Sequence, residues 1–187
     1  MRLFSPKSPF ITITAFYALA LTEYHMNMHI HDSCEIMYVT KGCCQIFLET
    51  GDHTLREKEF IFLNANVPHR LSIPDGASCS LLNLEFHCGS QKTPVNLMEA
   101  AKESPALSSF LHSFGDDSVG YDSGNLGYAV KDLILYLEKT LSSSVSSPDQ
   151  LFMSRLLFFR FLLELADGLS HPQKEAGMAY LRFPMRI

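Results

Sequence analysis

The stretch that decides the fold is His29-Ile30-His31-Asp32-Ser33-Cys34-Glu35, and a single His69 follows it further along the chain. Side chains two residues apart on a β-strand leave the backbone on the same side, so His29 and His31 share one face. Asp32 and Ser33 predict a turn, after which Glu35 brings a carboxylate back from a neighbouring strand. His69 would add a third imidazole. The pattern predicts a cluster of polar side chains.

The residues before this stretch alternate between an apolar and a polar face. The apolar face carries Tyr24, Met26, Met28 and Ile30, and the polar face carries Glu23, His25, Asn27, His29 and His31. A half-buried strand would turn its polar face to water, whereas a barrel that holds a ligand would turn it inward. We expect the inward orientation, because the strand pattern Glu35–Gly42 follows the histidines directly.

The spacing His29-x-His31-x3-Glu35-x6-Gly42 resembles the first motif of the cupin superfamily, and Pro68-His69 resembles a shortened second motif. The run from His29 through Phe86 is similar to the amino-terminal sensor domain of AraC-type bacterial transcription regulators. The second motif departs from the enzymatic cupin pattern, since it lacks the glycine before the histidine and has Ile73 in place of an asparagine. The resemblance implies a mainly β, cupin-type jelly-roll barrel followed by two or three C-terminal α-helices.

Short alternating or apolar runs predict the strands of this barrel. They cover residues 10–17, 21–30, 34–41, 43–50, 53–56, 60–63, 69–73 and 78–87, a spacing typical of a jelly roll. The corner Arg56-Glu57-Lys58-Glu59 is commonly Gly-Asp in the sensor family. Here Lys58-Glu59 keeps the acid but loses the glycine, so we expect a different turn.

Helical periodicity replaces the strands after a linker at residues 91–94, which divides the chain into a barrel over 1–90 and a helical appendage over 91–187. Apolar residues at helical spacing predict a helix over 125–141. Ser147-Pro148-Asp149-Gln150 combines an N-cap, a proline in the first turn and a capping-box glutamine. The helix that starts there should end at a Gly168 C-cap.

The helix over 149–167 is apolar nearly all round, so it must be covered on more than one side. Either the helix 125–141 and the segment 104–114 cover it, or a second subunit does. The resemblance favours a homodimer through 125–141 and 149–167. Residues 175–182 faintly resemble the entry into the regulators' DNA-binding half. We therefore expect an excised sensor domain that reaches DNA only through a helix-turn-helix domain not present in this chain.

Composition restricts the class of protein. The chain of 187 residues has 47% hydrophobic residues, a net charge of -5, and 15 Lys and Arg against 20 acids. It has no basic stripe that could neutralise phosphates, so we do not expect it to bind nucleic acid alone. Its five cysteines lack Cys-x-x-Cys spacing, which predicts free thiols in the cytoplasm. No run approaches the roughly 20 apolar residues that span a membrane.

Three hypotheses follow for the polar cluster, and none assigns a catalytic residue. The first is a sensor for a small polar molecule such as a sugar; its ligand-binding residues are His25, Asn27, His29, His31, Glu35 and His69. The second is a metal-dependent cupin enzyme, a dioxygenase or an isomerase. In either case His29, His31, Glu35 and His69 could hold a divalent Zn, Ni, Fe or Mn. The third is a polar cluster without a ligand.

Overall fold

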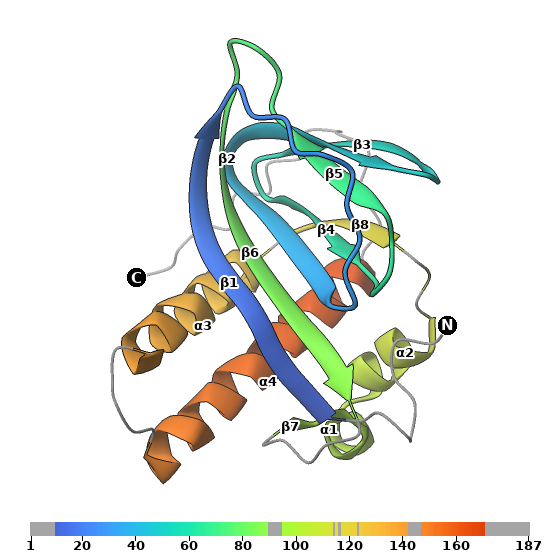
Figure 1. Ribbon diagram of the computed structural model, residues 1–187. Helices are drawn as coiled ribbons and strands as arrows, with labels where there is room; N and C mark the ends of the chain where they lie inside the picture. Colours follow the sequence, from blue (N-terminus) through green and yellow to red (C-terminus); the bar gives the residue numbers. More distant parts are fainter. Residues whose placement is uncertain are drawn as a thin grey trace, which may run out of the picture.

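The computed structural model describes residues 10–89, 95–113, 115, 117–122, 124–141 and 147–170. Antiparallel strands form two sheets, and helices lie along one face of the larger sheet (Figure 1). The strands are β1 Phe10–Thr22, β2 Cys34–Leu48, β3 Gly51–Arg56, β4 Glu59–Leu63, β5 His69–Ser72, β6 Ser78–Gly89, β7 Val95–Asn96 and β8 Asp117–Tyr121. The helices are α1 Leu97–Glu103, α2 Pro105–Ser113, α3 Leu126–Leu141 and α4 Pro148–Ser170.

Strand β2 belongs to both sheets. Its first half pairs with β4 and β6 in the larger sheet, whose order is β7-β1-β6-β2-β4-β8. Its second half pairs with β3 and β5 in the smaller sheet. Strands β7 and β8 come from the second half of the sequence, so the chain beyond residue 90 contributes to the sheet as well as the helices. The expected mainly β, jelly-roll class is confirmed.

Gly42 lies where β2 passes from one sheet to the other. Its φ is +79°, a left-handed conformation that side chains with a Cβ disfavour. A Cβ built on Gly42 would lie 2.1 Å from the carbonyl oxygen of Ser78 on β6. Only glycine therefore allows the chain both to turn and to approach β6 so closely.

Alternation along the central strands builds two apolar cores. On β2, Met37 and Val39 face the core between the sheets, while Ile36 and Tyr38 face the helices. The core between the sheets consists of Met37, Val39, Cys44, Ile46, Leu48, Leu55, Ile61, Leu63, Leu71, Ile73, Cys79 and Leu81. The barrel interior is thus mainly apolar, and its polar residues gather at one end.

The helices pack on the face of the larger sheet that points away from the barrel interior (Figure 1). Phe158 and Phe161 of α4 lie against Phe86 of β6, with ring centroids 5.6 and 6.3 Å away. The predicted capping box is confirmed, because the Ser147 N–H donates to Gln150 Oε1 (2.7 Å) and the Gln150 N–H donates to Ser147 Oγ (3.2 Å). Among the described residues, no helix has the length and apolar character needed to cross a bilayer.

Several predicted boundaries are wrong. Of the predicted strand 21–30, only the residues up to Thr22 are strand, as the end of β1; the following residues make isolated bridges at His25 and His29. The predicted strands 34–41 and 43–50 are one continuous strand, since the bulge beside Lys41 bends β2 without ending it. Helix α4 continues past Gly168, which packs against the Phe60 ring.

Two further expectations concern short segments. The described part of the chain has four helices where two or three were expected, because Asn96 caps the additional short helix α1. Lys58 adopts φ +68° in the corner where the sensor family commonly has glycine, so the backbone turns in a left-handed conformation without a glycine. The linker 91–94 lies outside the described residues.

Gly42→Ala should lower the free energy of unfolding by about 2–4 kcal/mol, because it adds a left-handed strain of about 1–2 kcal/mol to an overpacked contact. Gly76→Ala is the matched control: Gly76 also has positive φ (+74°), but a Cβ added there would meet no atom within 4 Å. Gly76→Ala should therefore lower the free energy of unfolding only by the left-handed strain. Urea denaturation measures both, and equal losses would show that the Ser78 contact is unimportant.

Candidate functional site

Three backbone segments bring four of the predicted site residues together. Glu35 is the second residue of β2, and His69 is the first residue of β5. His29 and His31 lie on the extended segment between β1 and β2. Reciprocal hydrogen bonds of 3.0 Å between the backbones of His29 and His69 tie this segment to β5. The cluster therefore depends on main-chain pairing between residues 40 positions apart.

The three imidazoles and the carboxylate lie in mutual contact. Ring centroids are 4.2 Å apart for His29 and His69, 5.1 Å for His31 and His69, and 5.6 Å for His29 and His31. Oε2 of Glu35 lies 2.9 Å from His69 Nε2 and 3.3 Å from His31 Nε2. His69 is 2% exposed and Glu35 is 5% exposed, whereas His29 and His31 are half-buried toward the open side.

Backbone carbonyl groups fix which nitrogen of each imidazole faces the cluster. Nδ1 of His31 contacts the Ser33 oxygen at 2.9 Å, Nδ1 of His69 contacts the Val67 oxygen at 2.8 Å, and Nδ1 of His29 contacts the Asn27 oxygen at 3.3 Å. A carbonyl oxygen only accepts, so each Nδ1 carries the proton and donates. In the neutral rings each Nε2 then carries a lone pair, which is the arrangement of metal-ligating histidines. When His31 is protonated, its Nε2 donates to Glu35 Oε2 at 3.3 Å instead.

Burial and hydrogen bonding act in opposite directions on Glu35. Burial raises the pKa of its carboxyl group, but the hydrogen bond from His31 and the adjacent His69 outweigh this and bring the pKa to about 2. The Glu35 hydrogen bond raises the pKa of His31 despite partial burial. At neutral pH Glu35 is therefore an anion, and it attracts positive charge to the cluster.

These donor groups fit a divalent cation. The ligand atoms of His29, His31 and His69 all lie within 4.8 Å of one another, and Glu35 adds an anionic oxygen. His69 Nε2 is buried and has no aligned hydrogen-bond partner among the described residues, although it faces Glu35. A buried polar atom without a partner is costly unless a ligand completes its bonding. The chemistry of the set, three nitrogens and a carboxylate, suits Zn, Fe, Ni or Mn.

His25 and Asn27, the other two predicted ligand-binding residues, lie outside this cluster. The His25 side chain is 59% exposed and its Nδ1 contacts Ser72 Oγ at 2.7 Å, while Asn27 is exposed. Tyr24 and Met26 pack toward the core between the sheets instead. After Asn27 the orientation reverses, since Met28 and Ile30 are exposed and the histidines turn inward. An irregular segment permits this reversal, whereas a regular strand would not.

A second layer of polar side chains lies beside Glu35, and the sequence prediction missed it. Tyr17 Oη donates to Glu85 Oε1 at 3.2 Å, and Asn83 Nδ2 donates to Tyr17 Oη. Asn83 and Glu85 follow Leu81 on the inward face of β6, so their alternation was a usable signal. Tyr17 carried no comparable signal, because only the β1–β6 register brings it opposite Asn83.

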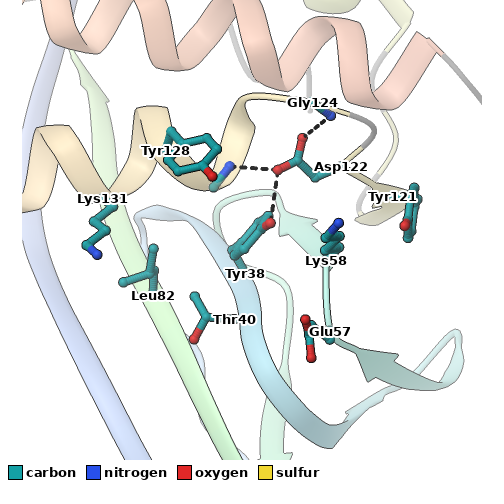
Figure 2. Close-up of a pocket in the computed structure, with 11 residues that line it drawn as sticks. Tyr38, Thr40, Glu57, Lys58, Leu82, Tyr121, Asp122, Gly124, Tyr128 and Lys131 are labelled. Atoms are coloured by element: carbon teal, nitrogen blue, oxygen red, sulfur yellow. Dashed lines mark hydrogen bonds between the residues drawn. The ribbon is translucent and has the colours of Figure 1, made fainter. Parts of the chain in front are cut away.

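A separate hollow of about 330 Å³ lies between the larger sheet and α3 (Figure 2). Asp122 at its edge accepts hydrogen bonds from Tyr38 Oη (2.9 Å) and from the N–H groups of Gly124 (2.9 Å), Leu126 (3.1 Å) and Gly127 (2.8 Å). One carboxylate thus caps α3 and joins it to β2. The sequence prediction missed this cap.

One known family matches part of the sequence. Residues 14–93 match the family described as AraC-like ligand binding domain, so a ligand-binding domain of this cupin type occupies that part of the chain. No curated protein matches the sequence.

Similar solved structures share low sequence identity with the chain. A protein from Neisseria meningitidis is 21% identical over 45% of this chain and 90% of that chain, with a TM-score of 0.34. A cupin-2 domain containing protein from Shewanella frigidimarina is 20% identical over 44% and 83%, with a TM-score of 0.34. A predicted oxalate decarboxylase from Thermotoga maritima is 16% identical over 40% and 67%, with a TM-score of 0.38.

Asp122→Ala should lower the free energy of unfolding by about 2–4 kcal/mol, because it removes the cap and leaves Tyr38 without its acceptor. Burial opposes ionisation of Asp122, but the N–H groups of Gly127 and Gly124 and the Tyr38 hydroxyl hold its pKa below the ordinary 3.8. This stabilisation is present above pH 3.8 and is lost as the pH falls through the folded-state pKa. Denaturation at pH 7 and pH 3 should show the difference from wild type shrinking in acid. A difference that stays constant would exclude the charged cap.

Proposed function

We propose that this chain is the effector-binding and dimerisation domain of an AraC-type bacterial transcription regulator. The match of residues 14–93 to the AraC-like ligand binding domain carries the proposal. The effector is a small polar molecule such as a sugar, bound at the end of the barrel where the polar side chains gather. The domain acts in the cytoplasm, in keeping with its free cysteines, and reaches DNA through a helix-turn-helix domain outside this chain.

The geometry of the cluster supports small-molecule binding at this end. His69 and Glu35 are buried and fixed, whereas His29 and His31 are accessible, so a ligand can approach without disturbing the apolar core. Hydroxyl groups both donate and accept, which suits imidazole nitrogens beside a carboxylate. His25 and Asn27 precede the cluster in the sequence and lie outside it, so they could contact only a ligand that extends beyond the cluster.

A divalent cation at His29, His31, Glu35 and His69 belongs to the proposal, since these groups fit one. Such an ion would polarise oxygen atoms of a bound molecule. The same donor set supports a second candidate, a metal-dependent cupin enzyme of the dioxygenase or isomerase type. Turnover of a substrate by the metal-loaded protein would establish that alternative, whereas binding without turnover favours the sensor.

The exposed apolar surface of helix α4 supports the proposal of a dimer. One face is buried against α3 and the sheet through Phe158, Phe161, Leu162, Leu165 and Ala166. Another face carries Phe152, Leu156 and Leu163, all exposed, and Leu151 and Met153 are also exposed in the first turns of the helix. The groove between this face and α1–α2 has a volume of about 600 Å³. Exposed apolar surface of this extent suits a subunit interface formed by α4 together with α3.

The effector prediction can be tested with a panel of monosaccharides and polyols in a thermal-shift assay followed by calorimetry. At least one compound should bind wild type, and His29→Ala should weaken it by about tenfold through loss of a ligand hydrogen bond. His112→Ala, at an exposed position on α2, is the control and should bind normally. If no compound in the panel binds, or if His29→Ala binds as well as wild type, sugar recognition at this cluster is wrong.

The dimer prediction concerns Leu156 on α4, whose side chain is exposed. Wild type should elute as a dimer in gel filtration with light scattering at micromolar concentration. Leu156→Glu should produce monomers, because it places a charge in the apolar interface. Tyr121→Glu changes a similarly exposed residue on β8 and should leave the dimer intact. A monomeric wild type at high micromolar concentration would contradict the proposed interface.

A further inference from the structure

Glu85 is an acidic residue close to the cluster of His29, His31, Glu35 and His69, and the proposed function gives it no role. In the register of β2 and β6 it pairs directly with Glu35, and both side chains lie on the inward face of the sheet. Like charges directly opposite each other on neighbouring strands destabilise a sheet. A positive group between these two carboxylates would therefore stabilise the folded protein.

The described protein groups supply little positive charge at this place. No ion pair of Glu85 with a lysine or arginine occurs within the described residues. The His31 imidazole is close to both acids: one ligand atom each of His31, Glu35 and Glu85 lie within 4.8 Å of one another. The buried His69 Nε2 beside Glu35 also has no aligned partner among the described residues. One imidazole between two carboxylates leaves an excess of acceptors, which an external cation would satisfy.

Neighbouring side chains hold Glu85 in place. Tyr17 donates to Oε1 of Glu85, and Asn83 supports Tyr17 by donating to its hydroxyl oxygen. Burial raises the pKa of Tyr17, so this hydroxyl remains a donor at neutral pH. Oε2 of Glu85 has no hydrogen bond within the described part of the chain. One oxygen is thus fixed by Tyr17 while the other can reach a ligand.

We propose, on the basis of the cation site in the proposed function, that Glu85 is an additional ligand of the same cation. The protein would then supply three imidazole nitrogens and two carboxylate oxygens. Glu85 would thereby raise the number of protein ligands from four to five. Manganese accepts this coordination with carboxylate oxygens, whereas zinc in proteins prefers four ligands. Glu85 therefore raises the affinity for Mn²⁺ more than the affinity for Zn²⁺.

Competition titrations with a chelating dye test this selectivity, with Mn²⁺ and Zn²⁺ as separate probes on metal-free protein. Zinc binds more tightly than manganese to most sites, so the informative quantity is the ratio of the two affinities. Glu85→Gln should weaken Mn²⁺ binding by about tenfold or more and Zn²⁺ binding by distinctly less. Glu99→Gln, an exposed acid on α1, should change neither affinity. An unchanged ratio in Glu85→Gln overturns the proposal.

Thermal unfolding adds a readout that a purely structural role of Glu85 would not reproduce. Metal-free Glu85→Gln should melt above wild type, because the substitution removes the repulsion with Glu35 and keeps an acceptor for Tyr17. With saturating Mn²⁺ the order should reverse, since the variant binds the ion more weakly. A variant that melts below wild type in both states would show that Glu85 serves only as a structural acceptor.

A third variant separates the failure of this inference from the failure of the site. His31→Ala removes a ligand that both proposals require, so it should lose both metals. If wild type binds neither metal, the cation site of the proposed function fails together with the role of Glu85. If wild type binds both metals and His31→Ala binds neither, but Glu85→Gln matches wild type, only the role of Glu85 is wrong.

Discussion

The structure depends on the passage of one strand, β2, through two sheets. Gly42 makes this passage possible, because its left-handed backbone and missing Cβ allow β2 to bend within contact of Ser78. Before the bend, alternate residues of β2 serve the helix-facing core and the barrel interior. Glu35 therefore points inward in the same register that buries Met37 and Val39. The buried carboxylate and the apolar core are consequences of one strand geometry.

Periodicity in the sequence was sufficient to predict most of the fold. The apolar run Phe60–Leu63 predicted β4, and the apolar stripe from Leu126 predicted α3 to within a residue. The capping box at Ser147 predicted the start of α4. These features are local, since each depends on residues within a few turns or a single strand.

Features that depend on distant contacts were not predictable in this way. The alternation of residues 21–31 looks like a strand, but the chain there is held by isolated bridges to β5, and its faces reverse after Asn27. The convergence of His29, His31, Glu35 and His69 agrees with the expected spacing. The alternation of β6 assigned Glu85 to the inward face, but a two-residue period does not give the cross-strand register that places Glu85 opposite Glu35 and Tyr17 opposite Asn83.

Main-chain groups prepare the histidine cluster more than side chains do. Each imidazole donates from Nδ1 to a carbonyl oxygen two residues away in the sequence, so the local backbone sets the orientation of every ring. This arrangement keeps Nε2 of all three rings free of the backbone, and those of His31 and His69 lie beside Glu35. Side chains around the cluster can therefore vary its ligand preference without changing how the rings are held.

Strand β8 has a consequence for how the chain can be divided. It pairs with β4 along five residue positions and covers the outer edge of the larger sheet. An uncovered edge strand offers free N–H and C=O groups to other molecules and promotes aggregation. Separating the barrel from the rest at residue 90 would expose the edge formed by the apolar strand β4. The barrel and the helical half are therefore best regarded as a single cooperative folding unit.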